Sequence, residues 1–202
     1  MGDRHFDKTA CELFGSILTP LGFTQRGSER CTFYRKVGED VFHFVMPSIG
    51  SRGAWYQVFV FPHSPHIDPL FEKRFPDNVG IPTDAWSLLS ESDGVNITQQ
   101  QFNCKNEDNL RRGFATTVGP LLLKVAVPYL DRFQKVDDIV PVIRHPSFLG
   151  FALHHLGRSE EAVAALQRER ARIRTLDMSN KDVAALLEHV ERLLKEGEKG
   201  TF

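Results

Sequence analysis

The chain is poor in the features that mark disulfide-rich and zinc-binding proteins. Its 202 residues include three cysteines, Cys11, Cys31 and Cys104. This odd number, without a CxxC spacing, argues against a disulfide framework and against a cysteine zinc cluster. We therefore predict three reduced thiols.

An excess of charge of either sign is also missing. Lys and Arg total 25 and Asp and Glu total 26, which gives a net charge of -1 at pH 7. A protein that binds nucleic acid or anionic membranes usually carries a strong positive field. We therefore predict neither nucleic acid nor membrane as a partner.

Signal sequences and long apolar runs are absent as well. The amino-terminal residues MGDRHFDK contain no apolar core, and the uninterrupted apolar stretches fall far short of the roughly 20 residues that span a bilayer. These observations predict a cytoplasmic protein. The glycines stand singly, so phosphate-binding loops, dinucleotide fingerprints and G-x-S-x-G elbows are missing. We expect no cofactor.

The residues that are present indicate an α+β fold. Apolar side chains recur every three or four positions from Phe6 to Leu18, which predicts a helix that ends at Pro20. Strand-like segments rich in β-branched and aromatic residues follow at 31–36, 41–46 and 55–61, and a more polar one at 97–104. Because short links join the first three segments, we predict an antiparallel β-meander of about four strands packed with helices.

The second half of the chain has helical periodicity. A long helix is predicted from Asn106 to Leu130, with a kink or break where Pro120 or Pro128 removes a backbone donor. Three shorter helices follow, at 148–156, at 159–173 and after a capping sequence at 179–182. The predicted organisation is an α+β domain at 1–143, a helical carboxy-terminal extension packed on it at 144–196, and a frayed tail at 197–202.

Three segments carry a likeness to a known family: ILTPLGF at 17–23, CTFYR at 31–35 and VPYLDRF at 127–133. Over residues 6–143 the chain resembles the bacterial family called domain of unknown function 4304, in which a helix ends in Leu-Gly-Phe and a strand reads Thr-Phe-Tyr-Arg. It departs from the family at 45–47, where a glutamine is usual, and over 62–94. The resemblance implies a compact bacterial cytosolic α+β domain and supplies no catalytic residue.

The segment LGFALHHLGRSEEA at 149–162 resembles one tetratricopeptide helical hairpin. Small residues at Gly150 and Ala162 would let two antiparallel helices approach closely. Because no second repeat follows at the expected period, we expect the hairpin to pack on the main domain. Relatives of such hairpins usually bind proteins.

The strongest candidate for chemistry is the segment HSPHID at 63–68. Two imidazoles and a carboxylate, from His63, His66 and Asp68, stand at the end of a predicted strand, where they could bind a metal ion or transfer a proton. The alternative is a structured polar loop. The neighbours His154 and His155 point about 100° apart on a helix, which favours a surface or packing role.

Other candidates have a structural alternative too. His43 is expected on a strand face with Val41 and Val45, as a partly buried, hydrogen-bonded residue. Sixteen phenylalanines indicate an aromatic core, although some of them, with Trp55, Tyr56 and Trp86, could line an exposed binding face.

Two hypotheses of function follow. The first is a non-enzymatic protein-binding module, with an immunity-like role as one setting, that presents its aromatic residues or the loop after residue 62 to a protein partner. Its candidate site residues are Trp55, Tyr56, His63, His66, Asp68 and Trp86. The alternative is a small metal-assisted hydrolase that uses His63, His66 and Asp68.

Overall fold

The computed structural model describes residues 3–26, 31–50, 53–68, 70, 71, 75, 101–143 and 145–198. Contacts divide the chain into two compact units. Unit 1 contains Met1–Pro62 and Asp84–Gln134, and unit 2 contains His63–Thr83 and Lys135–Phe202. The sequence predicted a division after residue 143. The packing of the extension on the α+β domain stays a prediction.

Unit 1 is built on a five-stranded sheet with the strand order β1-β2-β3-β4-β5. Its strands are β1 (Thr24–Arg26), β2 (Thr32–Val37), β3 (Val41–Ile49), β4 (Trp55–His63) and β5 (Phe102–Asn103). The pairings of β1 with β2, β2 with β3 and β4 with β5 are antiparallel. The predicted α+β fold with an antiparallel meander is therefore confirmed.

The number of strands differs from the prediction because of β1. This strand consists of the polar residues TQR, two of them exposed, so it lacks the apolar alternation by which strands are recognised in a sequence. In the structure, β1 is recognised as a strand by its antiparallel pairing with β2. Of the predicted segment 97–104, residues 97–100 lie outside the described part of the chain, and β5 falls within the remainder.

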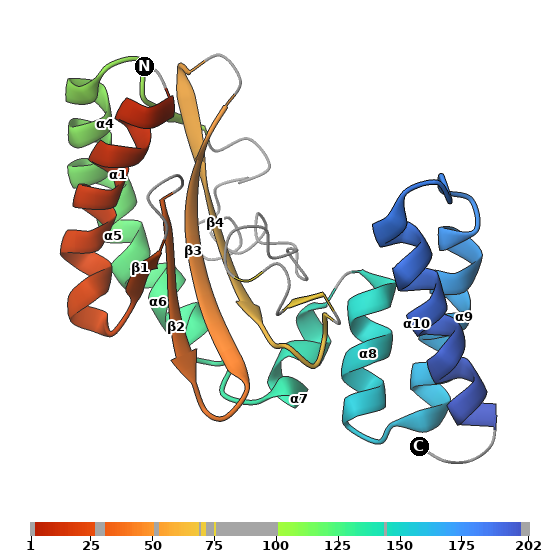
Figure 1. Cartoon of the computed structure of the whole chain (residues 1–202). Coiled ribbons are helices and arrows are strands. Elements are labelled where there is room, and N and C mark those ends of the chain that lie inside the picture. Colours follow the sequence, from red (N-terminus) through yellow and green to blue (C-terminus); the bar gives the residue numbers. More distant parts are fainter. Residues whose placement is uncertain are drawn as a thin grey trace. The chain divides into compact units, whose positions relative to one another are not determined.

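Helix α1 (Asp3–Leu18) packs on the first three strands and on α4 (Glu107–Gly113), as Figure 1 shows. The short 3-10 helix η1 (Thr19–Leu21) contains Pro20 and follows α1 directly, as the sequence predicted for the helix end. Phe14 lies at the centre of this packing, with its ring centroid 6.5 Å from that of Phe33 and 5.0 Å from that of Phe114. All three rings are buried, so these phenylalanines form core and not binding surface.

The long helix continues past both prolines. It runs from Glu107 to Leu130 through α4, η3 (Phe114–Val118), α5 (Gly119–Leu121), η4 (Leu122–Ala126) and α6 (Val127–Leu130). The segments η3 and η4 are wider π-helical turns, each two residues ahead of a proline. Of the predicted kink or break, the break does not occur, because the wider turns accommodate the backbone carbonyl that each proline leaves without a donor.

This helix is also long and apolar enough to cross a membrane, since an 18-residue window within it has a mean hydropathy of 1.3. In the structure 44% of that window is buried. A core helix and a membrane span share such a composition, so hydropathy here is weak evidence for a span.

A buried histidine joins the sheet to the segment after the long helix. His43 on β3 is fully buried, and its Nδ1 atom accepts a hydrogen bond of 3.2 Å from Nε of Arg35. Because an arginine can only donate, the proton of the neutral ring lies on Nε2, which donates to the backbone oxygen of Phe133 at 2.8 Å. Arg35 also forms an ion pair with Asp131. The predicted hydrogen-bonded His43 is confirmed.

Gly38 reverses the chain between β2 and β3 with a positive φ of 56°. A Cβ atom at this position would lie inside the van der Waals contact distance of the backbone oxygen of Gln134. A backbone oxygen cannot turn away as a flexible side chain can. Both the conformation and the available space therefore require glycine here.

Replacing Gly38 by alanine is expected to lower the free energy of unfolding of unit 1 by about 2 kcal/mol, because overpacking adds to backbone strain. Gly22 is the matched control, with a φ of 82° and, among the described residues, no atom within 4 Å of the position that a Cβ atom would take. Gly22→Ala is expected to cost about 1 kcal/mol. Urea unfolding followed by tryptophan fluorescence measures both values, and equal losses would contradict the role given to the Gln134 contact.

Unit 2 contains α7 (Val136–Ile139), η5 (Val140–Val142), α8 (Pro146–His155), α9 (Ser159–Ile173) and α10 (Lys181–Glu198). Helix α9 packs against both α8 and α10 (Figure 1). A Cβ atom at Gly150 would lie 2.7 Å from a methyl carbon of Leu166, and Ala162 is fully buried. The three predicted carboxy-terminal helices and their close approach at these small residues are confirmed.

Candidate functional site

Four of the eight histidines line one open pocket of unit 2. The pocket has a volume of about 570 Å³. Its walls come from the turn after β4, the end of α8 and the middle of α10. The lining residues are Pro65, His66, Phe151, His154, His155, Gly157, His189 and Leu193.

The turn after β4 directs His66 into this pocket. The Ser64 hydroxyl accepts a hydrogen bond from the His66 backbone N–H at 3.2 Å, and the Ser64 carbonyl accepts one from Ile67 at 3.1 Å. Ile67 is fully buried, so it anchors the turn while His66 stays exposed. An ST-type turn of this kind holds the imidazole outward without any regular secondary structure.

The His66 ring stacks on the ring of His155, with their centroids 3.7 Å apart and their planes 8° from parallel. The stack joins the turn after β4 to the end of α8, so two imidazoles from distant parts of the chain form one wall of the pocket.

The other two histidines are held closer to the neutral form. Burial lowers the pKa of His154, and burial followed by the positive charge of Arg192 lowers the pKa of His189. Arg192 donates to Nδ1 of His189 at 2.9 Å, so Nε2 of that ring carries its proton. The edge of the same ring packs on Phe151, 5.1 Å between centroids.

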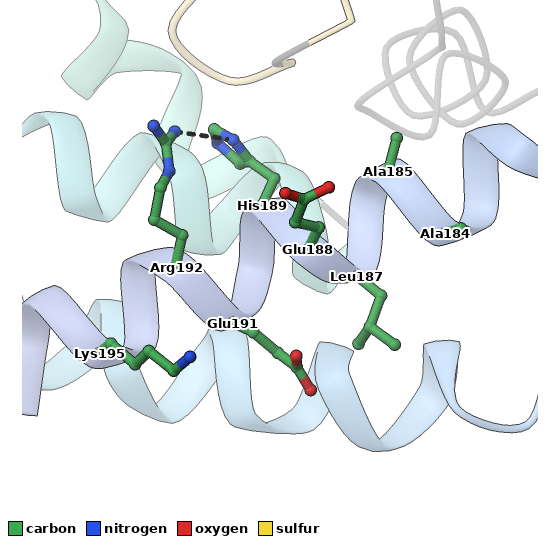
Figure 2. Close-up of a pocket in the computed structure, with 8 residues that line it drawn as sticks. All are labelled: Ala184, Ala185, Leu187, Glu188, His189, Glu191, Arg192 and Lys195. Atoms are coloured by element: carbon green, nitrogen blue, oxygen red, sulfur yellow. Dashed lines mark hydrogen bonds between the residues drawn. The ribbon is translucent and has the colours of Figure 1, made fainter.

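A second hollow of about 680 Å³ lies along α10 and shares His189 with the histidine pocket. Figure 2 shows His189 and Arg192 joined by their hydrogen bond, while Leu187 and Glu191 extend to the opposite side of the helix. All eight lining residues of this hollow come from α10. It is thus the surface of one helix, whereas the histidine pocket is built by three segments.

The structure divides the predicted site at 63–68. His63 and Asp68 come together, with 3.9 Å between Nε2 and Oδ2, and both are buried. The His63 ring packs beside Phe71 and Phe148, at 4.9 and 5.8 Å between centroids. His66 turns away toward His155. The described residues hold no group of three His, Cys, Asp or Glu arranged to bind a metal ion, so the metal-site alternative gains no support and stays a prediction.

The predicted aromatic residues also have different positions. Tyr56 is fully buried against Phe6, 5.3 Å between ring centroids, and burial raises the pKa of its hydroxyl. Tyr56 is therefore a core residue, which corrects its assignment to an exposed face. Trp55 is half-buried, and Trp86 lies outside the described residues.

Sequence reasoning missed the pocket because its histidines are far apart in the chain. The sequence predicts a surface or packing role for the adjacent pair His154 and His155, but nothing in it links this pair to His66 or His189. Only the folded structure shows that the turn after β4 exposes His66 and that α8 places His155 beside it.

No family model matches the chain, and no match was found among the curated proteins or the solved structures. The resemblance to the family called domain of unknown function 4304, and that to a tetratricopeptide hairpin, therefore stay predictions. A function is accordingly inferred from the geometry of the histidine pocket.

Proposed function

We propose that the protein is a non-enzymatic binding module that takes up an acidic side chain of a protein partner in its histidine pocket. One observation carries the proposal: four histidines from three segments converge on a single pocket in whose lining, among the described residues, no acidic side chain occurs. An imidazole N–H donates to a carboxylate, and a protonated imidazole does so with the added strength of opposite charge.

The size and the apolar residues of the pocket fit a short peptide segment. Its volume of about 570 Å³ is within the range of pockets that hold small ligands. Phe151 and Leu193 are almost fully buried and supply an apolar surface beside the imidazoles. A partner segment with an acidic and an apolar side chain next to each other would satisfy both kinds of surface.

The lining residues favour binding over catalysis. In the part of the chain that the structure describes, they include no serine, cysteine or carboxylate that would act as a nucleophile or as the partner of a general base. A histidine–carboxylate pair does occur nearby, between His63 and Asp68, but both side chains are buried away from solvent. An immunity-like role, which the sequence predicted, is one biological role that fits such a binding module.

The proposal is tested with an acetylated and amidated peptide of sequence Asp-Phe-Glu-Asp-Leu-Glu. Protein labelled at histidine is titrated with it, and the imidazole carbon-bound protons are followed by NMR. The eight histidines provide internal controls, because His5, His43, His63 and His145 are not among the pocket residues. We expect shifts confined to His66, His154, His155 and His189.

The expected pH dependence follows from the same chemistry. A bound carboxylate favours protonated imidazole, so binding takes up protons and the affinity rises as the pH falls from 8 to 6. The rise is up to about tenfold per pH unit for each proton taken up. His155→Ala is expected to weaken binding about tenfold, whereas His5→Ala on the exposed surface of unit 1 leaves it unchanged. Equal binding of the Asn/Gln version of the peptide would overturn the proposal.

A further inference from the structure

The outer side of the long helix of unit 1 carries almost no charge. From Gly113 to Leu130 the sequence contains one charged residue, Lys124. A helix on the surface of a soluble protein normally places charged and polar residues opposite its buried stripe. An uncharged outer side is instead typical of a surface that contacts another molecule.

The exposed residues of this side form a line along the helix, which lies beside α1 (Figure 1). They recur at every fourth position, as Arg112, Thr116, Pro120, Lys124 and Pro128. Leu123 lies next to this line and is 50% exposed, which is the highest exposure of any large hydrophobic side chain among the described residues. An apolar side chain thus stands in water at the middle of an uncharged surface.

Opposite charges stand at the two ends of the line. Arg112 is exposed, and its Nη2 atom donates to the side chain of Asn109 at 2.9 Å. Asp131 directly follows the helix, and its side chain is 52% exposed. Its Oδ1 atom accepts from Arg35, whereas its Oδ2 atom has no hydrogen-bond partner among the described residues. The line therefore begins with a cation and ends with an anion, and each has room for a further partner.

We propose that this side of the long helix is a homodimer interface, in which two copies of the chain pack their long helices antiparallel across a two-fold axis. With the axis at the midpoint between Leu121 and Leu122, Arg112 of each copy lies opposite Asp131 of the other. The charges at the two ends therefore complement those of a second copy of the same surface. Such self-complementary contacts are the most common in soluble oligomers, because a single patch closes the assembly.

The same register brings apolar residues together between the charged ends. Leu123 lies opposite Pro120 of the second copy, and Ala115 lies opposite Pro128. Helices pack with their axes about 8 to 10 Å apart, and the small side chains on this surface favour the close end of that range. Lys124 keeps its ammonium group in water at the edge of the contact, because its side chain is long and flexible.

The neighbouring arginine does not oppose this register. Arg111 lies on the α1 side of the helix, where its Nη2 atom contacts Glu12 at 3.1 Å and its Nε atom donates to Glu107 at 2.7 Å. Its charge is thus already balanced by two carboxylates, away from the line of exposed residues.

The size of the contact indicates how tight the dimer is. From Gly113 to Leu130 the helix is about 27 Å long, at about 1.5 Å per residue. One helix face of this length buries less than the roughly 800 Å² per partner that stable complexes bury. We therefore expect a reversible dimer with a dissociation constant of about 10 to 100 μM.

The test is analytical ultracentrifugation of the full chain at physiological salt, from about 1 μM to about 500 μM, which brackets this dissociation constant. We expect the average mass to rise from one chain toward two as the concentration increases. Leu123→Glu is expected to weaken the dimer at least tenfold, because the two-fold axis places the new charge in the contact twice.

Two further variants identify the surface. Arg112→Glu sets like charges opposite each other at both ends and is expected to weaken the dimer about fivefold. Leu176→Glu is the matched control, since Leu176 is also an exposed leucine, at 39%, but lies between α9 and α10 in unit 2. It is expected to leave the dissociation constant unchanged.

A chain that is monomeric at every concentration, or a dimer that Leu123→Glu does not weaken, would overturn the proposal. Sedimentation with vesicles of phosphatidylcholine and phosphatidylserine tests the other occupant, because a chain that binds vesicles and stays monomeric in solution would assign this surface to lipid instead. Should circular dichroism show that Leu123→Glu is unfolded, Thr116→Arg on the same line replaces it. The interface lies in unit 1 and the histidine pocket in unit 2, so the two proposals fail independently.

Discussion

Arg172→Ala is expected to lower the free energy of unfolding of unit 2 by about 3 kcal/mol, the lower end of the cost of leaving a buried charge unpaired. Glu169 on α9 is fully buried, and Arg172 contacts both of its carboxylate oxygens. The distances are 2.8 Å from Nε and 2.7 Å from Nη2. The cost stays at the lower end because the Arg172 side chain is itself 39% exposed, so the cationic partner of the pair is already partly solvated.

Its control is an exposed pair in the same unit. Arg174 contacts Glu191 at 2.8 Å, but its side chain is 59% exposed. Exposed ion pairs contribute about 0 to 1 kcal/mol, so Arg174→Ala is expected to cost less than about 1 kcal/mol. Urea unfolding followed by circular dichroism at the helical band compares the two variants.

A double variant tests the cause of the loss. Glu169→Gln combined with Arg172→Ala replaces the buried carboxylate by a neutral amide, and we expect it to recover a part of the stability lost in Arg172→Ala. Similar losses in Arg172→Ala and Arg174→Ala, without any recovery in the double variant, would show that the carboxylate is not what makes this pair costly to break.

Acidification is expected to destabilise unit 1 through His43. Burial is the main cause that lowers the pKa of His43 to about 4, with the charge of Arg35 adding to it, while the Phe133 carbonyl and Asp131 act in the opposite direction. In the unfolded chain the same side chain titrates at about 6.5. Between these two pKa values, the unfolded state therefore binds a proton at His43 that the folded state does not bind.

The sign and the pH range follow from this difference. Above pH 6.5 the ring is neutral in both states, so protonation of His43 causes no loss in the free energy of unfolding. Between pH 6.5 and pH 4 the free energy of unfolding falls by up to about 1.4 kcal/mol per pH unit, to a total loss of about 3 kcal/mol. Below pH 4 the folded state is protonated as well, and the loss from this group is complete.

The variant His43→Gln isolates this contribution. A glutamine amide can accept from Arg35 and donate to the Phe133 carbonyl, but it does not titrate. Carboxylates in the rest of the chain change the stability of both proteins alike, so the difference between the two curves reports His43. We expect the difference to shrink by about 3 kcal/mol from pH 7 to pH 4, as measured by urea unfolding with tryptophan fluorescence. A constant difference would contradict the prediction.

The sequence by itself determined the elements whose signal is local. The three- and four-residue spacing of apolar side chains placed α1 and the three carboxy-terminal helices, because a helix that buries one face must repeat its apolar residues at the helical period. Alternating and aromatic runs placed β2, β3 and β4 for the corresponding reason in strands. The prolines of the long helix indicated a disturbance, but whether the helix broke or widened depended on its packing.

Only the tertiary structure decided which distant residues meet. It brought His66 to His155 and placed Gly38 against Gln134. It also separated His66 from its sequence neighbours His63 and Asp68, because a turn with a buried Ile67 sends adjacent side chains to opposite sides. The periodicity of apolar residues indicates which face of a helix or strand is buried. Which residues meet across that face depends on the packing of all the elements together. The proposed chemistry depends on those contacts.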